Sequence, residues 1–141
     1  MPPFAALTEE TPVNQLTPAE RAAGWQLLFD GTTTSGWRGF KQKEFPRRGW
    51  VVEDGCLKHI QRGGGGDLIT DASFQDFELS FEWRLGPRAN SGLKYFITEE
   101  RAGAIGHEYQ LIDDAALGYA KPGSKHQTAS FYDVLAPTAW Q

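Results

Sequence analysis

The sequence has almost no cysteine, no long apolar run and no excess of positive charge. Its 141 residues include one cysteine, Cys56, so no disulfide can form within the chain. The formal net charge is −4, which provides no basic surface for nucleic acid or for an anionic membrane. No apolar stretch approaches the roughly 20 residues needed to cross a bilayer. The sequence therefore predicts a protein that binds neither nucleic acid nor membrane.

What the chain has in quantity is turn formers and aromatic side chains. It contains 16 Gly, 8 Pro, 9 Phe, 5 Trp and 4 Tyr residues. Many turns joined by aromatic-rich segments are typical of short strands in a sandwich or barrel. We expect residues 1–16, which are polar and contain three prolines, to be a flexible arm. We expect residues 17–141 to form one all-β domain.

The clearest helix signal lies at the start of this domain. Thr17 is a good N-cap, Pro18 follows at the first helical position, and Glu20 completes a capping box. Gly24 can end the helix. The pattern predicts one short N-terminal helix.

The rest of the domain reads as strands and turns. Asp54-Gly55 is a two-residue hairpin turn within 49–59. The strongest strand signal is 74–85, because Phe77, Leu79, Phe81 and Trp83 alternate with polar residues and should face the core. Further strands are expected at 25–31, after the glycines of 63–66, from residue 90, at 106–114 and at 129–137.

The segment 106–114, GHEYQLIDD, carries the chemistry of most interest. On a strand Glu108 and Gln110 point to one face, while Tyr109 and Leu111 point to the other and anchor the strand in the core. Asp113 falls on the core face unless a bulge or the strand end returns it to the face of Glu108. The plain alternative is that the polar residues are a solvated sheet surface.

Seven segments occur together in an order and spacing that resemble one family. They are GWQLLFDGTTTSGW, GWVVEDGCLKH, GGGGDLIT, DFELSFEWRL, NSGLKYF, EYQLIDD and ASFYDVLAP. The chain resembles the 3-keto-disaccharide hydrolase family over about residues 23–137. This resemblance implies a concanavalin A-like jelly-roll sandwich and a small carbohydrate substrate. It also implies a bacterial, exported sugar-degrading setting, periplasmic or extracellular, although the chain shows no signal peptide. A cytoplasmic location stays open.

One feature departs from the family pattern. Family members continue past the ASFYDVLAP segment into further strands that complete the sandwich, whereas this sequence stops at Gln141. We expect that C-terminal strands are lacking, which leaves an open sheet edge. Either a longer chain or an assembly, a homo-oligomer or a strand-donating partner, would then cover that edge.

The resemblance also implies a reaction. A ketone at C3 of a sugar acidifies the hydrogen on C2, so a base can form an enolate that expels the group on C1, and water then adds back. This needs a base, a positive group at the ketone oxygen and an acid for the leaving group. We expect Glu108 to be the base, Lys94 the electrophile and His107 the acid. An alternative for His107 is to ligate a divalent metal ion together with Glu108; no other cofactor is expected.

Four further residues are expected to contact the sugar. Gln110 donates to and accepts from hydroxyl groups, and Asp113 and Glu78 can join the same surface. Asn90 belongs to this set, and the stretch from Asn90 to Gly92 is expected to form a turn that permits close backbone approach.

The sequence is also compatible with two other functions. One is a non-catalytic carbohydrate-binding module, since jelly rolls serve both purposes. The other is a β-glucanase, because Glu108-x-Gln110-x-x-Asp113 has the spacing of E-x-D-x-x-E enzymes. The amide at position 110 removes one carboxylate of that motif, which ranks the glucanase last.

Overall fold

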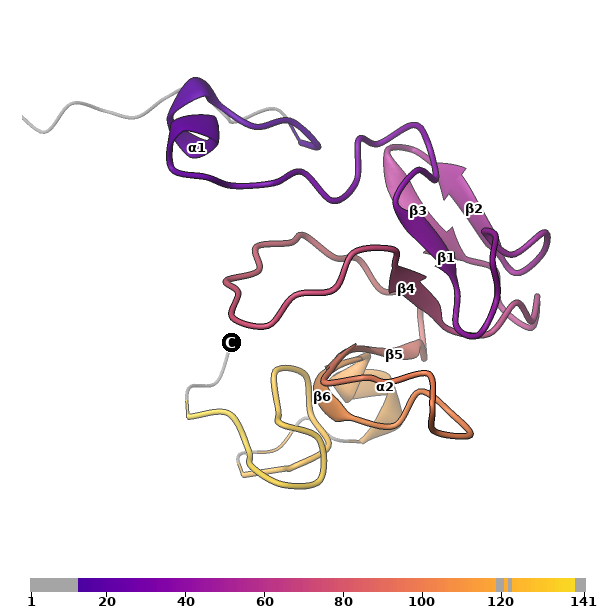
Figure 1. Ribbon diagram of the computed structural model, residues 1–141. Helices are drawn as coiled ribbons and strands as arrows, with labels where there is room; N and C mark the ends of the chain where they lie inside the picture. Colours follow the sequence, from indigo (N-terminus) through magenta and orange to yellow (C-terminus); the bar gives the residue numbers. More distant parts are fainter. Residues whose placement is uncertain (1–12, 119–120, 122, 139–141) are drawn as a thin grey trace, which may run out of the picture. The chain divides into compact units, whose positions relative to one another are not determined.

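The computed structural model describes residues 13–118, 121 and 123–138 (Figure 1). The chain divides into two compact units, with the boundary between Gln75 and Asp76. The elements are α1 (Pro18–Ala22), β1 (Trp37–Gly39), β2 (Trp50–Glu53), β3 (Cys56–His59), β4 (Leu68–Thr70), β5 (Asn90–Tyr95), β6 (His107–Ile112) and α2 (Asp114–Leu117). The all-β class is confirmed. The strands form three two-stranded antiparallel sheets, and the facing sheets of a jelly roll stay a prediction.

Helix α1 begins as the capping signal predicts. The Glu20 backbone N–H donates to the Thr17 hydroxyl at 3.2 Å, and the Thr17 backbone N–H donates to the Glu20 carboxylate at 2.7 Å. These are the two reciprocal bonds of a capping box. Ala23 caps the other end, and Gly24 follows with a φ of 89°. The predicted helix is confirmed.

The predicted hairpin is strands β2 and β3. Trp50 pairs with His59 and Glu53 with Cys56, which leaves Asp54 and Gly55 as the turn. Their φ values of 52° and 70° are both left-handed, as a type I′ turn requires. The Asn14 side-chain amide donates to the Gly55 carbonyl at 2.8 Å. The predicted arm otherwise falls mainly on residues 1–12, which lie outside the described residues.

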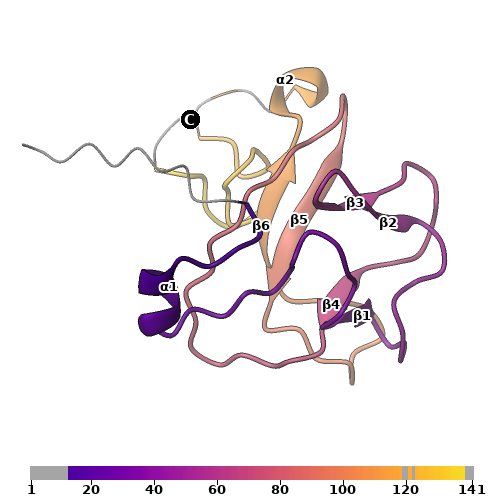
Figure 2. The same cartoon turned by 90° about the horizontal axis from the view of Figure 1, so that it is seen from above.

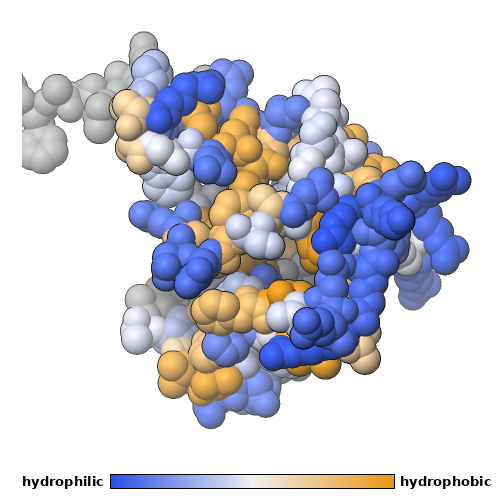
Figure 3. Space-filling view, in the orientation of Figure 1, coloured by the Kyte–Doolittle hydropathy of each residue, from blue (hydrophilic) through white to orange (hydrophobic). Residues whose placement is uncertain are grey.

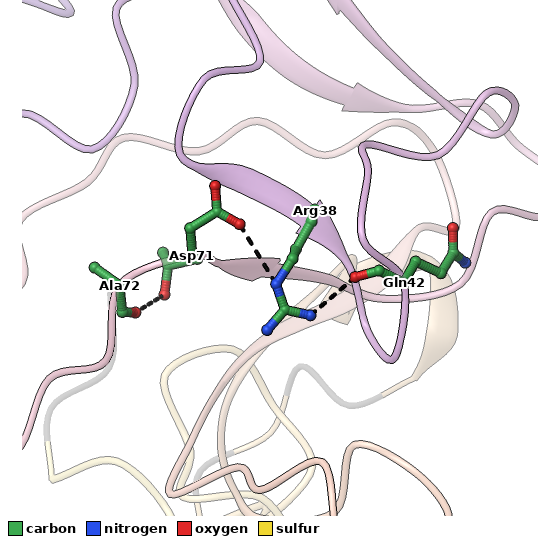
Figure 4. Close-up of polar contacts among 5 residues, drawn as sticks. Arg38, Gln42, Asp71 and Ala72 are labelled. Atoms are coloured by element: carbon green, nitrogen blue, oxygen red, sulfur yellow. Dashed lines mark hydrogen bonds and ion pairs between the residues drawn. The ribbon is translucent and has the colours of Figure 1, made fainter.

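Strand β4 follows the glycine run, as expected, and pairs with β1. Arg38 of β1 links this pair to its flanking segments (Figure 4). Its Nε lies 3.4 Å from a carboxylate oxygen of Asp71, and its guanidinium donates to the Gln42 carbonyl at 3.1 Å. A single side chain therefore holds the ends of two short strands.

The second unit is built on β5 and β6, which lie side by side with α2 directly after β6 (Figure 2). Their register pairs Gly92 with Gln110 and Lys94 with Glu108. The other edge of β6 is bonded to the segment 129–132, through a bridge between Tyr109 and Phe131. This segment lies alongside β6 in place of the full strand predicted at 129–137.

Two other strand predictions are wrong. No strand forms at 25–31, and none forms between Thr70 and Asn90, although 74–85 has the clearest alternation in the sequence. Phe77, Phe81 and Trp83 are 49%, 41% and 46% exposed. Alternation predicts a strand only where a neighbouring strand supplies hydrogen bonds, and within the described residues β5 and β6 pair with each other instead.

The buried side chains of the described residues are concentrated in the second unit. There the buried apolar ones are Leu111 and Ile112, and the buried polar ones are Gln110, Ser124, Gln127 and Ser130, whereas Pro46 is buried in the first unit. Among the described residues, no helix has the length and apolar character needed to span a membrane.

Candidate functional site

One face of the β5–β6 pair carries a row of polar side chains. Residues paired across antiparallel strands point to the same face, about 5 Å apart. Lys94 and Glu108 are such a pair. On the far side of Glu108, the Tyr132 N–H donates to the Glu108 carbonyl at 3.0 Å, which places Tyr132 opposite Glu108. The register therefore sets an amine, a carboxylate and a phenol in one row, and we call the side that bears them the polar face.

The next row of the polar face contains a gap. It consists of Gly92, Gln110 and Ser130, whose carbonyl accepts from the Gln110 N–H at 3.1 Å. A Cβ built on Gly92 would lie 2.8 Å from both Cγ and Cδ of Glu108. The carboxylate of Glu108 thus leans into the space that Gly92 leaves empty. Within the described residues this carboxylate has no hydrogen bond or ion pair, and the side chain is half-buried.

His107 lies on the opposite side of the sheet from Glu108. It pairs with Tyr95, and its ring packs edge-on against the rings of Tyr95, Phe96 and Phe131 at centroid distances of 5.3, 5.2 and 4.9 Å. Neighbouring residues on a strand point to opposite faces. The structure therefore does not bring His107 together with Glu108, as the expected roles of acid or of shared metal ligand would need.

The geometry does not support the expected metal site at Glu108 and His107. Glu108 and His107 cannot ligate one ion from opposite faces of a sheet. In the described part of the chain, no group of three or more His, Cys, Asp or Glu side chains is arranged to hold a metal.

Gln110 shares the polar face with Glu108, as the alternation predicted, but it does not open to solvent. Its side chain is 1% exposed. Leu111 on the other face is also buried, at 8%. Gln110 is therefore not exposed for the expected contact with a sugar, because the segment after α2 covers this end of β6.

Asp113 has a structural role at the end of β6. It is the N-cap of α2, accepts from the Arg88 N–H at 2.7 Å and accepts from the Ala116 N–H at 3.2 Å. The bond from the Arg88 backbone, followed by that from Ala116, lowers the pKa of the Asp113 carboxyl. Its neighbour Asp114 accepts from the Thr128 N–H at 3.0 Å. The two aspartates that end the segment thus begin a helix and hold the chain that runs beside β6.

The two remaining predicted contact residues lie away from this row. Asn90 is the first residue of β5 and is exposed, so Asn90, Ser91 and Gly92 are strand residues and not the expected turn. Glu78 is exposed in the stretch between β4 and β5, where no strand forms.

The structure adds a histidine–aspartate pair that the sequence did not reveal. Nε2 of His126 lies 3.1 Å from a carboxylate oxygen of Asp133, and the His126 ring lies 5.2 Å from the ring of Tyr132. Tyr132 stands opposite Glu108, so the pair sits at the end of the polar row. A seven-residue separation through a loop follows no recognised motif, and only the fold brings these groups together.

A separate cavity of about 630 Å³ lies in the first unit, lined by residues 42–48 with Gly65 and Gly66. None of the predicted site residues lines it. Lys43, Arg47 and Arg48 give its wall a positive charge.

The fold and the site define an all-β protein that presents a carboxylate and an amine side by side on the polar face of a sheet. The chain belongs to the 3-keto-alpha-glucoside-1,2-lyase-like domain family, whose model matches residues 24–141. This confirms the family resemblance seen in the sequence.

One curated relative is the 3-keto-disaccharide hydrolase of Bacteroides thetaiotaomicron. It is 36% identical over 135 residues, and the match covers 81% of this chain and 46% of the relative. The chain thus spans about half the length of this relative. A crystal structure assigned to a glycosyl hydrolase from Parabacteroides distasonis superposes with a TM-score of 0.66 at 27% identity, covering 91% of this chain and 62% of the other.

Proposed function

We propose that this protein takes part in the hydrolysis of 3-keto-disaccharides, by proton abstraction at C2, elimination and hydration. The observation that carries the proposal is the cross-strand pair of Lys94 and Glu108 beside the gap at Gly92. The name and the 36% identity of the Bacteroides relative support the substrate class.

The roles follow from what each group can do. The Glu108 carboxylate removes a proton from C2. The neighbouring ketone makes this proton acidic. Lys94 lies one cross-strand step from Glu108, with the two Cβ atoms about 5 Å apart, so its flexible side chain can bring the ammonium to the oxygen on the adjacent carbon C3. There it stabilises the negative charge of the enolate.

The leaving group also needs a proton. We assign this role to His126 in place of His107, because Tyr132 connects His126 to the row of Glu108 while His107 faces the aromatic side. Asp133 orients the imidazole of His126 through its hydrogen bond. His126 then protonates the oxygen on C1 as the bond to the second sugar breaks.

The geometry disfavours the glucanase alternative. A retaining glycosidase needs a second carboxylate about 5–5.5 Å from the first. Both oxygens of Asp113 already accept backbone hydrogen bonds at the start of α2. A non-catalytic sugar-binding module is the alternative that the experiment must separate.

The test incubates the protein with a 3-keto-disaccharide and with its unoxidised parent and follows release of the second sugar. We expect cleavage of the keto form, with a loss of about 10²–10⁴-fold in Glu108→Gln because the base is gone. Glu78→Gln, an exposed glutamate of the same unit, is the matched control and should retain the rate.

Three outcomes count against the proposal. Cleavage of the parent sugar alone contradicts the keto-sugar substrate. Binding of both sugars without cleavage favours the binding module. An unchanged rate in Glu108→Gln removes Glu108 from the mechanism.

A further inference from the structure

In the described part of the second unit, three buried side chains have oxygen atoms without a hydrogen-bond partner. They are Oε1 of Gln110, Oε1 of Gln127 and Oγ of Ser130. The three residues are 1%, 4% and 0% exposed. In folded proteins nearly all such buried polar atoms are paired, so each unpaired one calls for an explanation.

Backbone hydrogen bonds bring the three residues together. The Gln110 N–H donates to the Ser130 carbonyl at 3.1 Å, and the Ser130 N–H donates to the Gln127 carbonyl at 3.1 Å. The Gln110 carbonyl also accepts from the Ala129 N–H at 2.9 Å. The three residues therefore meet at one junction between β6 and the segment 127–130.

The neighbouring hydroxyl at this junction, that of Thr128, makes hydrogen bonds both as donor and as acceptor. Oγ1 of Thr128 donates to the Ile112 carbonyl at 2.7 Å and accepts from the Ile112 N–H at 3.0 Å. The same segment thus pairs one hydroxyl fully and leaves the next one unpaired.

We propose that Gln110, Gln127 and Ser130 form a buried binding site for one neutral hydroxyl-bearing molecule. The occupant must donate hydrogen bonds, because two amide oxygens need donors. It must be neutral, because an unpaired charge at this depth would be strongly disfavoured. A water molecule that donates one hydrogen to each amide oxygen and accepts from the Ser130 hydroxyl satisfies all three atoms, and a sugar does so with two neighbouring hydroxyl groups.

Two sources offer this chemistry, an internal water molecule and two hydroxyl groups of one sugar. A buried water molecule ordinarily makes about three hydrogen bonds, the number available here. The three residues are at most 4% exposed, so a sugar reaches them only if the segment 127–130 moves aside; its ring would then lie on the polar face, one row from Glu108. The site does not depend on the proposed function; only its sugar form does.

The first experiment observes the glutamine amides directly in the unmodified protein. Nuclear magnetic resonance measures cross-peaks between the side-chain amide protons of Gln110 and Gln127 and bound water, without and with D-glucose. Cross-peaks that persist with glucose identify water, and saturable shifts with new cross-peaks to glucose identify a sugar hydroxyl. Either result supports the site. Absence of both overturns it.

The second experiment removes the Ser130 hydroxyl. The direction in which the urea midpoint of unfolding then changes depends on whether the site is occupied. If a molecule fills the site, Ser130→Ala removes a made hydrogen bond and lowers the urea midpoint of unfolding, as the paired reference Thr128→Val should. If the hydroxyl is unpaired in solution, Ser130→Ala raises the midpoint, and the proposal is contradicted. A lack of sugar cleavage alongside persistent water cross-peaks would reject the proposed function and leave this site standing.

Discussion

The position of the Glu108 carboxylate depends on the absence of a side chain at Gly92. The strand register puts Gly92 diagonally next to it on the polar face, and the carboxylate occupies the room where a Cβ would be. A neighbour of any other type would push the acid away from this place. Gly92 thereby determines where Glu108 stands, although glycine has no chemistry of its own.

Gly92→Ala tests this relation. The added methyl would overlap Oε1 of Glu108 and lie 2.8 Å from its Cδ, so the carboxylate must move. Because small displacements of a catalytic group can cost about 10²-fold in rate, we expect a loss of that order in cleavage of a 3-keto-disaccharide with little change in melting temperature.

Gly103→Ala is the matched control, since the nearest atom to its Cβ is 3.8 Å away. Equal rates in Gly92→Ala and in the control would show that the position of Glu108 does not matter.

The carboxylate of Asp113 has a structural role, because backbone hydrogen bonds engage it. The backbone N–H groups of Arg88 and Ala116 hold its carboxylate and lower its pKa below the ordinary value of about 3.9. A lowered folded pKa stabilises the fold fully above the unfolded value, and this contribution is lost as the pH falls through the folded value. Glu20 and Asp30 have pKa values lowered in the same way, by bonds from Thr17 and Thr33.

We therefore expect the urea midpoint of unfolding to fall below about pH 4 and to change little through this effect at higher pH. Asp113→Asn keeps a capping side chain but removes the charge, so its midpoint should fall less steeply with acid. Urea titrations at several pH values between 3 and 7 measure this. Parallel curves for the two proteins would contradict the assignment.

At the scale of elements, the polar face is assembled from two strands and one irregular segment. Strand β6 contributes Glu108 and Gln110 by alternation, and β5 contributes Lys94 by register. The segment 124–135 contributes Tyr132, His126 and Asp133. No periodic pattern in the sequence predicts that these three residues lie beside the polar face. The acid that the proposed reaction needs thus comes from a loop that the sheet holds in place.

His126→Gln tests the acid. We expect the rate with a 3-keto-disaccharide to fall by about 10²-fold or more, because the leaving sugar needs a proton. A 3-keto-glucoside with an acidic aryl leaving group needs no such proton, so its rate should fall far less. A loss of equal size for both substrates would indicate a structural role.

His59→Gln is the matched control. His59 is an exposed histidine of the first unit that also bonds to an acceptor, the Gly64 carbonyl at 3.1 Å. Its replacement should leave both rates unchanged.

The elements also show where sequence patterns succeed. Asp54-Gly55 predicted the β2–β3 hairpin correctly because a type I′ turn is decided by local backbone conformation. Residues 74–85 were predicted as the strongest strand and are not one, because a strand requires a partner and alternation says nothing about whether a partner is present.

For the whole molecule, the exposed apolar side chains of the second unit bear on its partners. Among them Phe96, Ile105 and Leu135 are 62%, 62% and 63% exposed, and apolar side chains reach the surface in Figure 3. Folded monomers rarely leave large apolar patches uncovered. In the described residues β5 pairs only with β6, so its other edge has no strand beside it. We propose that a second copy covers this region.

Self-association should follow. Sedimentation velocity should give a weight-average coefficient that rises with protein concentration in the micromolar range. Ile105→Lys should reduce the rise, because a charge in an apolar contact is costly. Val13→Lys, at a site equally exposed but in the first unit, should not. A monomer coefficient at every concentration would reject the second copy.

The sequence by itself determined the all-β class, the family, the helix α1, the β2–β3 hairpin and the strand alternation that puts Glu108 and Gln110 on one face. These depend on local backbone preferences or on an extended series of motifs. Only the tertiary structure decided that Lys94 stands across from Glu108, that His107 turns to the aromatic side, and that His126 pairs with Asp133. Cross-strand register and loop placement depend on contacts between residues far apart in the chain, which no local pattern encodes.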